Sequence, residues 1–92
     1  MSTYFMFGKY SMDGMKSISA RRTDKALALL KQNGGELISG YILLGETDLV
    51  LIVNFPDLPS AMKASVALSK LLSVSFSTLP ALAMADFDKL LE

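Results

Sequence analysis

The segment Gly45-Glu46-Thr47-Asp48 carries a pair of carboxylates that could do chemistry. Glu46 and Asp48 are two residues apart, so on a strand their side chains would share a face. Two such carboxylates can act as general acid and general base. The segment also separates two apolar runs, and a short link with Gly and Asp is typical of a hairpin turn. We favour the turn, in which Gly45 supplies a positive φ and Asp48 hydrogen-bonds nearby backbone amides.

Three tyrosines are the next candidates. Tyr4, Tyr10 and Tyr41 could line a cavity and offer hydroxyl groups to a ligand. Alternatively, each ring packs at an interface and its hydroxyl finds a local hydrogen bond, which is the interpretation we favour. If the chain binds a ligand, we expect these tyrosines and Asp48 to contact it. If it catalyses a reaction, Lys9 and Glu46 join them as groups able to move a proton, but no residue is singled out as catalytic.

The residues that are missing narrow the chemistry further. The sequence has no histidine and no cysteine. A Ser-His-Asp triad, a thiolate nucleophile and a sulfur–zinc site are therefore excluded. Histidine is also the common proximal ligand of haem. We predict no transition-metal site, no haem and no other cofactor.

The charge of the chain bears on its partners. Nine basic and nine acidic residues cancel, and no basic stripe is visible. Because phosphate contacts dominate nucleic-acid affinity, a neutral chain of this kind is a poor candidate for that partner or for an anionic membrane. The pair Arg21-Arg22 could bind a carboxylate or phosphate ligand. More often such a pair is a solvated helix end.

Size and hydrophobicity point to self-association. A chain of 92 residues corresponds to one small domain, which we place at residues 1–92. Its hydrophobic content of 51% and mean hydropathy of +0.39 are high for a small domain, so part of the apolar surface should meet another chain. The N-terminal segment does not resemble a signal peptide. No apolar run approaches the roughly 20 residues of a membrane-spanning helix. We therefore expect a cytoplasmic location.

Periodicity predicts the secondary structure. Strands are expected over Thr3–Tyr10, Glu36–Leu44, Leu49–Phe55 and Val74–Leu79. The order is β-α-β-β-α-β followed by a C-terminal helix, which is the α+β, ferredoxin-like arrangement. Its four-stranded sheet is antiparallel, with the first and third strands in the middle and the helices on one face.

Helix ends can be assigned from capping residues. The first helical pattern starts at Met15, breaks near residues 19–23 and continues as a main helix capped by Thr23. Gly34-Gly35 ends it. Asp57 or Ser60, with a proline in the first turn, opens the second helix. A short helix covers residues 83–91.

The central strands have no polar face. In the third strand, Leu49–Phe55, the side chains of Val50 and Ile52 point to one face of the sheet. The other apolar residues of this strand point to the opposite face. In the first strand we expect Tyr4 and Met6 to share the face of Val50 and Ile52. Two helices cover only one face, and an antiparallel sheet with a wet side should show polar residues there. A second copy of the chain is the simplest cover, so we predict a homodimer through this open sheet face, with a higher oligomer as an alternative.

Several of these features together resemble the GYD-domain family of small bacterial and archaeal proteins. They are Thr3-Tyr4, Gly8-Lys9-Tyr10, Gly34-Gly35, Gly45-Glu46-Thr47-Asp48 and Pro56-Asp57. The Gly-x-Tyr-Asp motif that names the family reads Gly45-Glu46-Thr47-Asp48 here, with threonine in place of tyrosine. The resemblance implies a dimeric α+β-barrel, in which two ferredoxin-like sheets pack face to face.

The resemblance implies no particular activity, so two classes of function remain. The first is a small-molecule binding or assembly module that works as a dimer. The second is a cofactor-free enzyme, of the monooxygenase or isomerase type, acting on a small apolar substrate in the barrel cavity. We rank the binding or assembly module first because few groups in the chain could move a proton.

Overall fold

The computed structural model describes residues 1–92 and contains the expected order of elements. The strands are β1 (Ser2–Tyr10), β2 (Glu36–Ile42), β3 (Leu49–Phe55) and β4 (Val74–Ala81). The helices are α1 (Met12–Lys16), α2 (Ala20–Gln32), α3 (Leu58–Leu72) and α4 (Met84–Leu90). The predicted α+β, ferredoxin-like fold is confirmed. No helix is long and apolar enough to cross a membrane.

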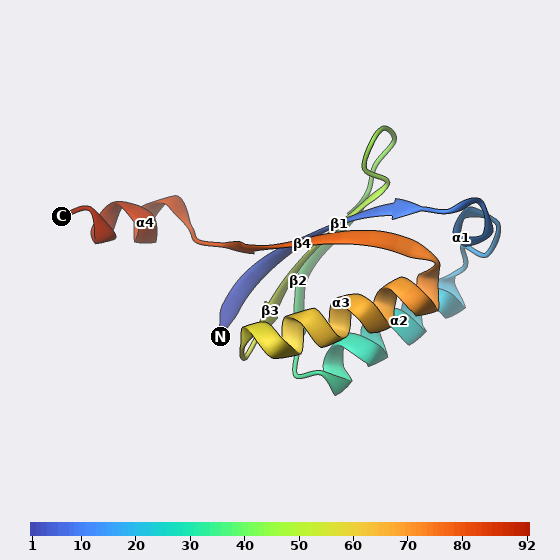
Figure 1. The fold of residues 1–92 in the computed structure, drawn as a ribbon, viewed down its shortest axis with the longest axis horizontal. Helices are drawn as coiled ribbons and strands as arrows, with labels where there is room; N and C mark the ends of the chain where they lie inside the picture. Colours follow the sequence, from blue (N-terminus) through green and yellow to red (C-terminus); the bar gives the residue numbers. More distant parts are fainter.

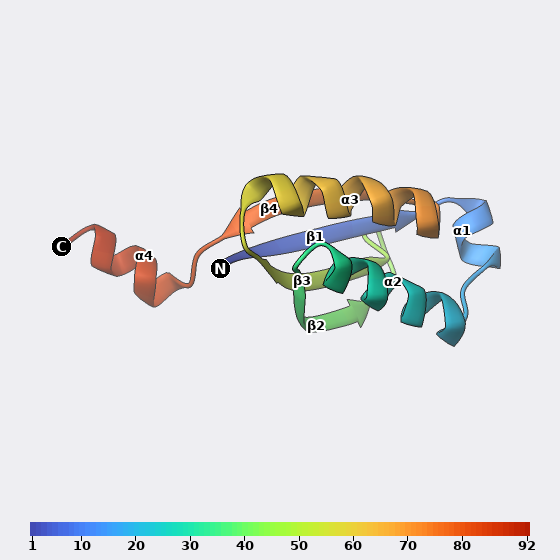
Figure 2. The same cartoon turned by 90° about the horizontal axis from the view of Figure 1, so that it is seen from below.

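The sheet is antiparallel throughout, with strand order β2-β3-β1-β4. The first and third strands are thus central, as predicted. Helices α2 and α3 lie side by side on one face of the sheet, and no helix lies on the other (Figures 1 and 2). The molecule therefore has two layers, and one sheet face is open.

The core lies between the sheet and its two helices. Met6, Val53, Phe55 and Leu68 are the largest side chains that are completely buried. Tyr4 belongs to the same core and meets the Phe55 ring edge to face, with 5.8 Å between the ring centres. The expectation that Tyr4 and Met6 lie on the open face is therefore wrong.

The open face is formed by the alternate residues of the same strands. Phe5 pairs with Ile52 and Phe7 pairs with Val50, so these four side chains lie together on the uncovered side. All four are only partly buried. The prediction for Val50 and Ile52 is confirmed, and their neighbours on β1 are the two phenylalanines. Leu79 of β4 pairs with Phe5 and extends the apolar surface toward the sheet edge.

The helix ends agree with the predicted caps in one case and not in the other. Asp57 accepts a hydrogen bond from the Ser60 amide at 2.8 Å and caps α3, as expected. Helix α2 begins earlier than predicted, because Ser19 rather than Thr23 is its N-cap. The helical pattern breaks at residues 17–19, where α1 has already ended. Gly34, at φ +75°, follows the end of α2 as expected.

Three strands differ in length from the prediction, and β1 begins one residue earlier than expected, at Ser2. Strand β2 ends at Ile42, two residues before Leu44, whereas β4 continues to Ala81 through Pro80. Proline is tolerated there because β4 is an edge strand. Helix α4 follows β4 and projects away from the sheet and from the other helices (Figures 1 and 2). It contains no buried residue.

Candidate functional site

The principal cavity lies between α2 and the β2 side of the sheet, and it measures about 450 Å³. That volume is within the usual range for small-molecule sites. Of the 16 lining residues, 12 are hydrophobic, so the cavity suits an apolar ligand. The lining is Tyr10, Ile18, Ser19, Ala20, Arg22, Thr23, Ala26, Leu27, Leu30, Leu37, Gly40, Tyr41, Ile42, Leu49, Leu51 and Leu72.

Local sequence explains how α2 forms one wall of this cavity. Ser19 caps the helix by accepting a hydrogen bond from the Arg22 amide at 3.1 Å. Ala26 and Leu30 are buried toward the sheet, whereas Leu27 is 40% exposed. The helix thus turns a continuous apolar stripe to the cavity and leaves its outer edge accessible.

Gly40 leaves space at the opposite wall of the cavity, because it has no side chain. It lies on β2 opposite Leu51, and a Cβ at this position would meet Leu51 Cδ2 at 3.0 Å. On the same strand, Ile42 pairs with Leu49, lines the cavity and is 67% exposed, so the cavity is accessible from solvent at this end. Tyr41 belongs to the lining as well, but it pairs with Val50, which places its side chain on the open face.

Arg22 is the only charged residue that lines the cavity. Its Nη1 atom donates to the Gly14 carbonyl oxygen at 2.7 Å and lies 3.5 Å from the Leu72 carbonyl oxygen. Its guanidinium also stands over the Tyr10 ring, 5.4 Å from the ring centre. No carboxylate pairs with it, because the one ion pair of the structure joins Lys9 and Asp48. Arg22 is therefore a positioned cation that could still receive an anion.

The residues expected to contact a ligand do not form one group. Tyr10 and Tyr41 both line the cavity. Tyr4 is only 4% exposed and belongs to the core. Asp48 lies outside the cavity, in the loop before β3. The structure therefore brings together two of the four candidates, and the ligand-binding role of each remains a prediction.

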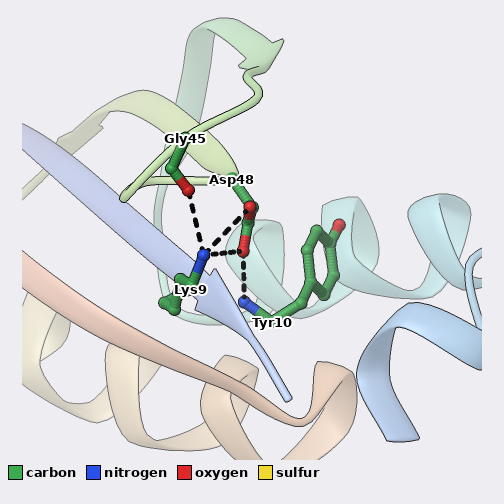
Figure 3. A network of polar contacts seen from close by, with 4 residues as sticks. All are labelled: Lys9, Tyr10, Gly45 and Asp48. Carbon is green, nitrogen blue, oxygen red and sulfur yellow. Dashed lines mark hydrogen bonds and ion pairs between the residues drawn. The ribbon is translucent and has the colours of Figure 1, made fainter. Parts of the chain in front are cut away.

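Asp48 belongs to a separate polar network at the end of β1 (Figure 3). Its carboxylate accepts a hydrogen bond from the Tyr10 amide at 3.0 Å and forms an ion pair with Lys9 at 3.3 Å. The Lys9 ammonium group also donates to the Gly45 carbonyl oxygen at 2.9 Å. The network ties the β2–β3 loop to β1, and Asp48 is buried within it at 6% exposure.

The backbone of the same loop supports the predicted turn. The Leu43 amide donates to the Asp48 carbonyl oxygen at 2.8 Å, and the Asp48 amide donates to the Gly8 carbonyl oxygen at 2.8 Å. Gly45 has φ +155°, which a β-branched residue rarely adopts. Glu46 is exposed whereas Asp48 is buried, so the two carboxylates have separate surroundings. The segment is a link between strands, and its aspartate fixes that link to β1.

Part of this site has only a weak signal in the sequence. Ile18 and Leu27 line the cavity, yet Ile18 lies in the short link before α2 and Leu27 is indistinguishable in type from the core leucines. A usable signal is the spacing of Ala20, Thr23, Leu27 and Leu30, which follows one side of a helix. No group of three or more Asp or Glu side chains gathers in one place. The arrangement can hold an apolar molecule and offer it one cation, from Arg22, and one phenol, from Tyr10.

Solved structures share this fold at low sequence identity. The leucine response regulatory protein LrpA of Mycobacterium tuberculosis matches with a TM-score of 0.59 and 17% identity, over 90% of this chain and 51% of LrpA. A transcriptional regulator matches with a TM-score of 0.60 and 18% identity, over 91% of this chain and 52% of its own. The chain thus spans about half the length of each structure. No curated protein sequence matches it.

The family comparison agrees with the resemblance seen in the sequence. The model of the GYD domain matches residues 4–91, which is nearly the whole chain and includes the cavity, the Gly45–Asp48 link and α4. The chain therefore belongs to the GYD domain family.

Proposed function

We propose that residues 1–92 act as one self-associating domain that binds a small, mostly apolar organic molecule. The observation that carries this proposal is the cavity of about 450 Å³ between α2 and β2. Apolar lining supplies affinity through the area removed from water, and a few polar groups fix the orientation of the ligand. Tyr10 is the proposed polar contact among the tyrosines, because the pairing of Tyr41 with Val50 places the Tyr41 side chain on the open face.

Arg22 indicates which polar group the ligand carries. It is partly buried, held in place by two carbonyl contacts and without an acidic partner. A guanidinium group binds carboxylates in a two-pronged geometry, and the remaining N–H groups of Arg22 can serve this purpose. The proposed ligand class is therefore a small carboxylic acid with an apolar body.

Catalysis receives less support from the geometry. Of the groups able to move a proton, Lys9 and Asp48 pair with each other outside the cavity, and Glu46 is exposed in the loop. Only the two tyrosines reach the cavity wall. A cofactor-free enzyme would need a proton donor or acceptor beside its substrate. We therefore rank binding above the enzyme alternative, and a cytoplasmic location stays a prediction.

Self-association is the second part of the proposal. Phe5, Phe7, Val50 and Ile52 form an apolar surface on the face that no helix covers. Like faces on two copies can meet around a two-fold axis, which gives a homodimer. Light scattering at micromolar concentration should give the mass of two chains. A well-folded species with the single-chain mass of 10.0 kDa would contradict this part.

Ligand binding can be tested with matched pairs of compounds and variants. Branched and aromatic carboxylic acids, each beside its neutral amide, are titrated into isotope-labelled protein while amide NMR shifts are recorded. We expect the acids to shift residues of α2 and β2, with the amides at least about tenfold weaker, because one charge-assisted hydrogen bond is worth roughly 1.5–3 kcal/mol. Arg22→Gln should remove the preference for acids, and Arg21→Gln should keep it.

A second pair of variants tests the location of the site. Leu27→Trp should fill the cavity and abolish the shifts, whereas Met62→Trp places the same bulk on the exposed side of α3, away from the lining. Acids that bind both tryptophan variants equally would show that the cavity is not the site. Absence of binding by every acid and amide would overturn the proposed ligand class.

A further inference from the structure

The C-terminal arm, which we define as Leu82–Glu92, is an apolar element with no partner in its own chain. Met84 is 84% exposed, Phe87 52%, Leu90 72% and Leu91 73%. At about 100° per residue these four side chains share one side of the helix. The arm's backbone hydrogen bonds are local, such as those from Phe87 to Ala83 and from Leu91 to Asp88. Nothing in the same chain covers this apolar side.

The position of the arm prevents its own domain from covering it. The chain leaves the sheet at the end of β4, where Ala81 still pairs with Thr3, and α4 then lies clear of both layers (Figures 1 and 2). The chain consequently extends 49 Å along its longest axis although it has only 92 residues. A seven-residue helix is not stable alone in water, where even about 12–15 residues are marginal. The helix α4 therefore needs to pack against a surface that its own chain does not provide.

We propose that the C-terminal arm packs against a second copy of the chain, beside the open sheet face. This inference rests on the proposed self-association but concerns a different surface. The arm leaves the sheet directly after β4, and Leu79 of that strand is 52% exposed on the open face. The arm therefore follows directly in the chain on a strand that contributes to the open face. A copy seated on the sheet would lie next to the arm.

The area that a stable dimer needs supports the same partner. Phe5, Phe7, Val50 and Ile52 are already partly buried by their neighbours. A fully exposed aromatic side chain offers about 150–250 Å², so these four have roughly 300 Å² left to bury. A standard interface removes about 800 Å² per partner. These four side chains alone fall short of it. Leu79 and Tyr41, which are 52% and 57% exposed on the same face, and the highly exposed residues of the arm can supply the rest.

The charge of the arm disfavours other partners. Asp86, Asp88 and Glu92 against Lys89 give residues 82–92 a net charge of −2. An acidic helix is repelled by nucleic acid and by anionic lipid, whose binding helices carry basic residues on the polar side. The whole chain has no net charge, so a second copy presents no comparable repulsion.

The absence of cysteine allows a direct test. Ala85→Cys places one thiol on α4 away from the apolar side, and a nitroxide label is attached to it. Chains that carry the nitroxide but no isotope are mixed with isotope-labelled chains that carry no nitroxide. If the arm crosses to the other copy, amides of β1 and β4 in the isotope-labelled chain should broaden. A dimer without such broadening would overturn this inference and leave the proposed sheet interface standing, whereas a monomer would overturn both.

The energetic contribution of the arm is tested by a pair of variants. Phe87→Ser with Leu91→Ser should raise the dimer dissociation constant at least about tenfold, because two large apolar side chains lose their burial. Lys89→Ser, on the other side of α4, should leave the dissociation constant unchanged. Sedimentation over a hundredfold concentration range measures both. Equal constants for the two variants would show that the arm's apolar side is not at the interface. Binding to vesicles of neutral lipid is measured as well. A chain that binds these vesicles and does not dimerise would also contradict the proposal.

Discussion

The two faces of the sheet use the same strands and similar residues, yet they have different roles. On the helix-covered face, Met6, Val53 and Phe55 are completely buried and define a core within one chain. On the open face, Phe5 and Ile52 pair directly but remain partly exposed. Apolar content alone does not distinguish the faces. The difference is whether α2 and α3 or a second chain completes the burial, so substitutions on the two faces should have different concentration dependence.

The largest expected effect is on the covered face. Phe55→Ala should lower the free energy of unfolding by about 3–5 kcal/mol, because a fully buried aromatic ring leaves a cavity that the structure cannot close. Urea unfolding at two protein concentrations measures this value. The loss should be the same at both concentrations, since the ring lies within one chain. A loss that depends on concentration would mean that Phe55 takes part in association.

A charge on the open face should act mainly on association. Ile52→Lys places an ammonium group in the proposed interface, and we expect the dimer to weaken by roughly 2–4 kcal/mol, because a charge is buried without a partner. Val66→Lys, on the exposed side of α3, is the matched control and should leave the mass unchanged. The parent protein should melt at a higher temperature as its concentration rises. Identical masses for both lysine variants would show that the open face is not an interface.

The β2–β3 link lies outside both faces and should give a smaller effect without concentration dependence. Gly45 has φ +155°, and no other atom lies within 4 Å of the point that a Cβ would occupy, so the cost of Gly45→Val comes from backbone conformation alone. We expect a loss of about 1–3 kcal/mol in urea unfolding. Glu46→Gln is the control and should be nearly silent. A valine variant as stable as the parent would contradict the conformation assigned to this link.

The smallest expected effect is the pH dependence at the start of α3. Hydrogen bonds from the Ser60 hydroxyl and the Ser60 amide lower the pKa of Asp57 below its ordinary value of 3.8. Because the folded pKa is the lower one, the stabilisation is present above pH 3.8 and is lost as the pH falls through the folded pKa. Asp57→Asn should keep the cap but remove this dependence. The free energy of unfolding is measured between about pH 5 and pH 2 for the parent and for Asp57→Asn. The same pH dependence in both proteins would contradict this prediction.

Local patterns in the sequence were sufficient to predict the order of the helices and strands and two residues of the open face. The alternation in β3 separates Val50 and Ile52 from their neighbours because side chains on a strand alternate with period two. The cap of α3 was also predictable, since Asp57 and Ser60 are three residues apart and bond locally. The GYD resemblance followed from short motifs, and the match over residues 4–91 confirms it.

Only the tertiary structure decided which face of β1 is covered. Tyr4, Phe5, Met6 and Phe7 are all apolar or aromatic, so their alternation does not say which set is inside. The register with β3, which places Phe5 opposite Ile52, decides it. The N-cap of α2 at Ser19 is by contrast a local contact, because Ser19 accepts a hydrogen bond from the Arg22 amide three residues later.

The candidate site depends even more on contacts between distant segments. Asp48 and Lys9 are separated by 39 residues, and no local rule connects them. The cavity forms because α2 stands opposite β2, with Tyr10 and Arg22 brought to its wall from different elements. Composition by itself determined the residue types available for binding, because it excludes histidine and cysteine chemistry. Which of those residues face one cavity was decided by strand register and helix placement, which arise from packing across the whole chain.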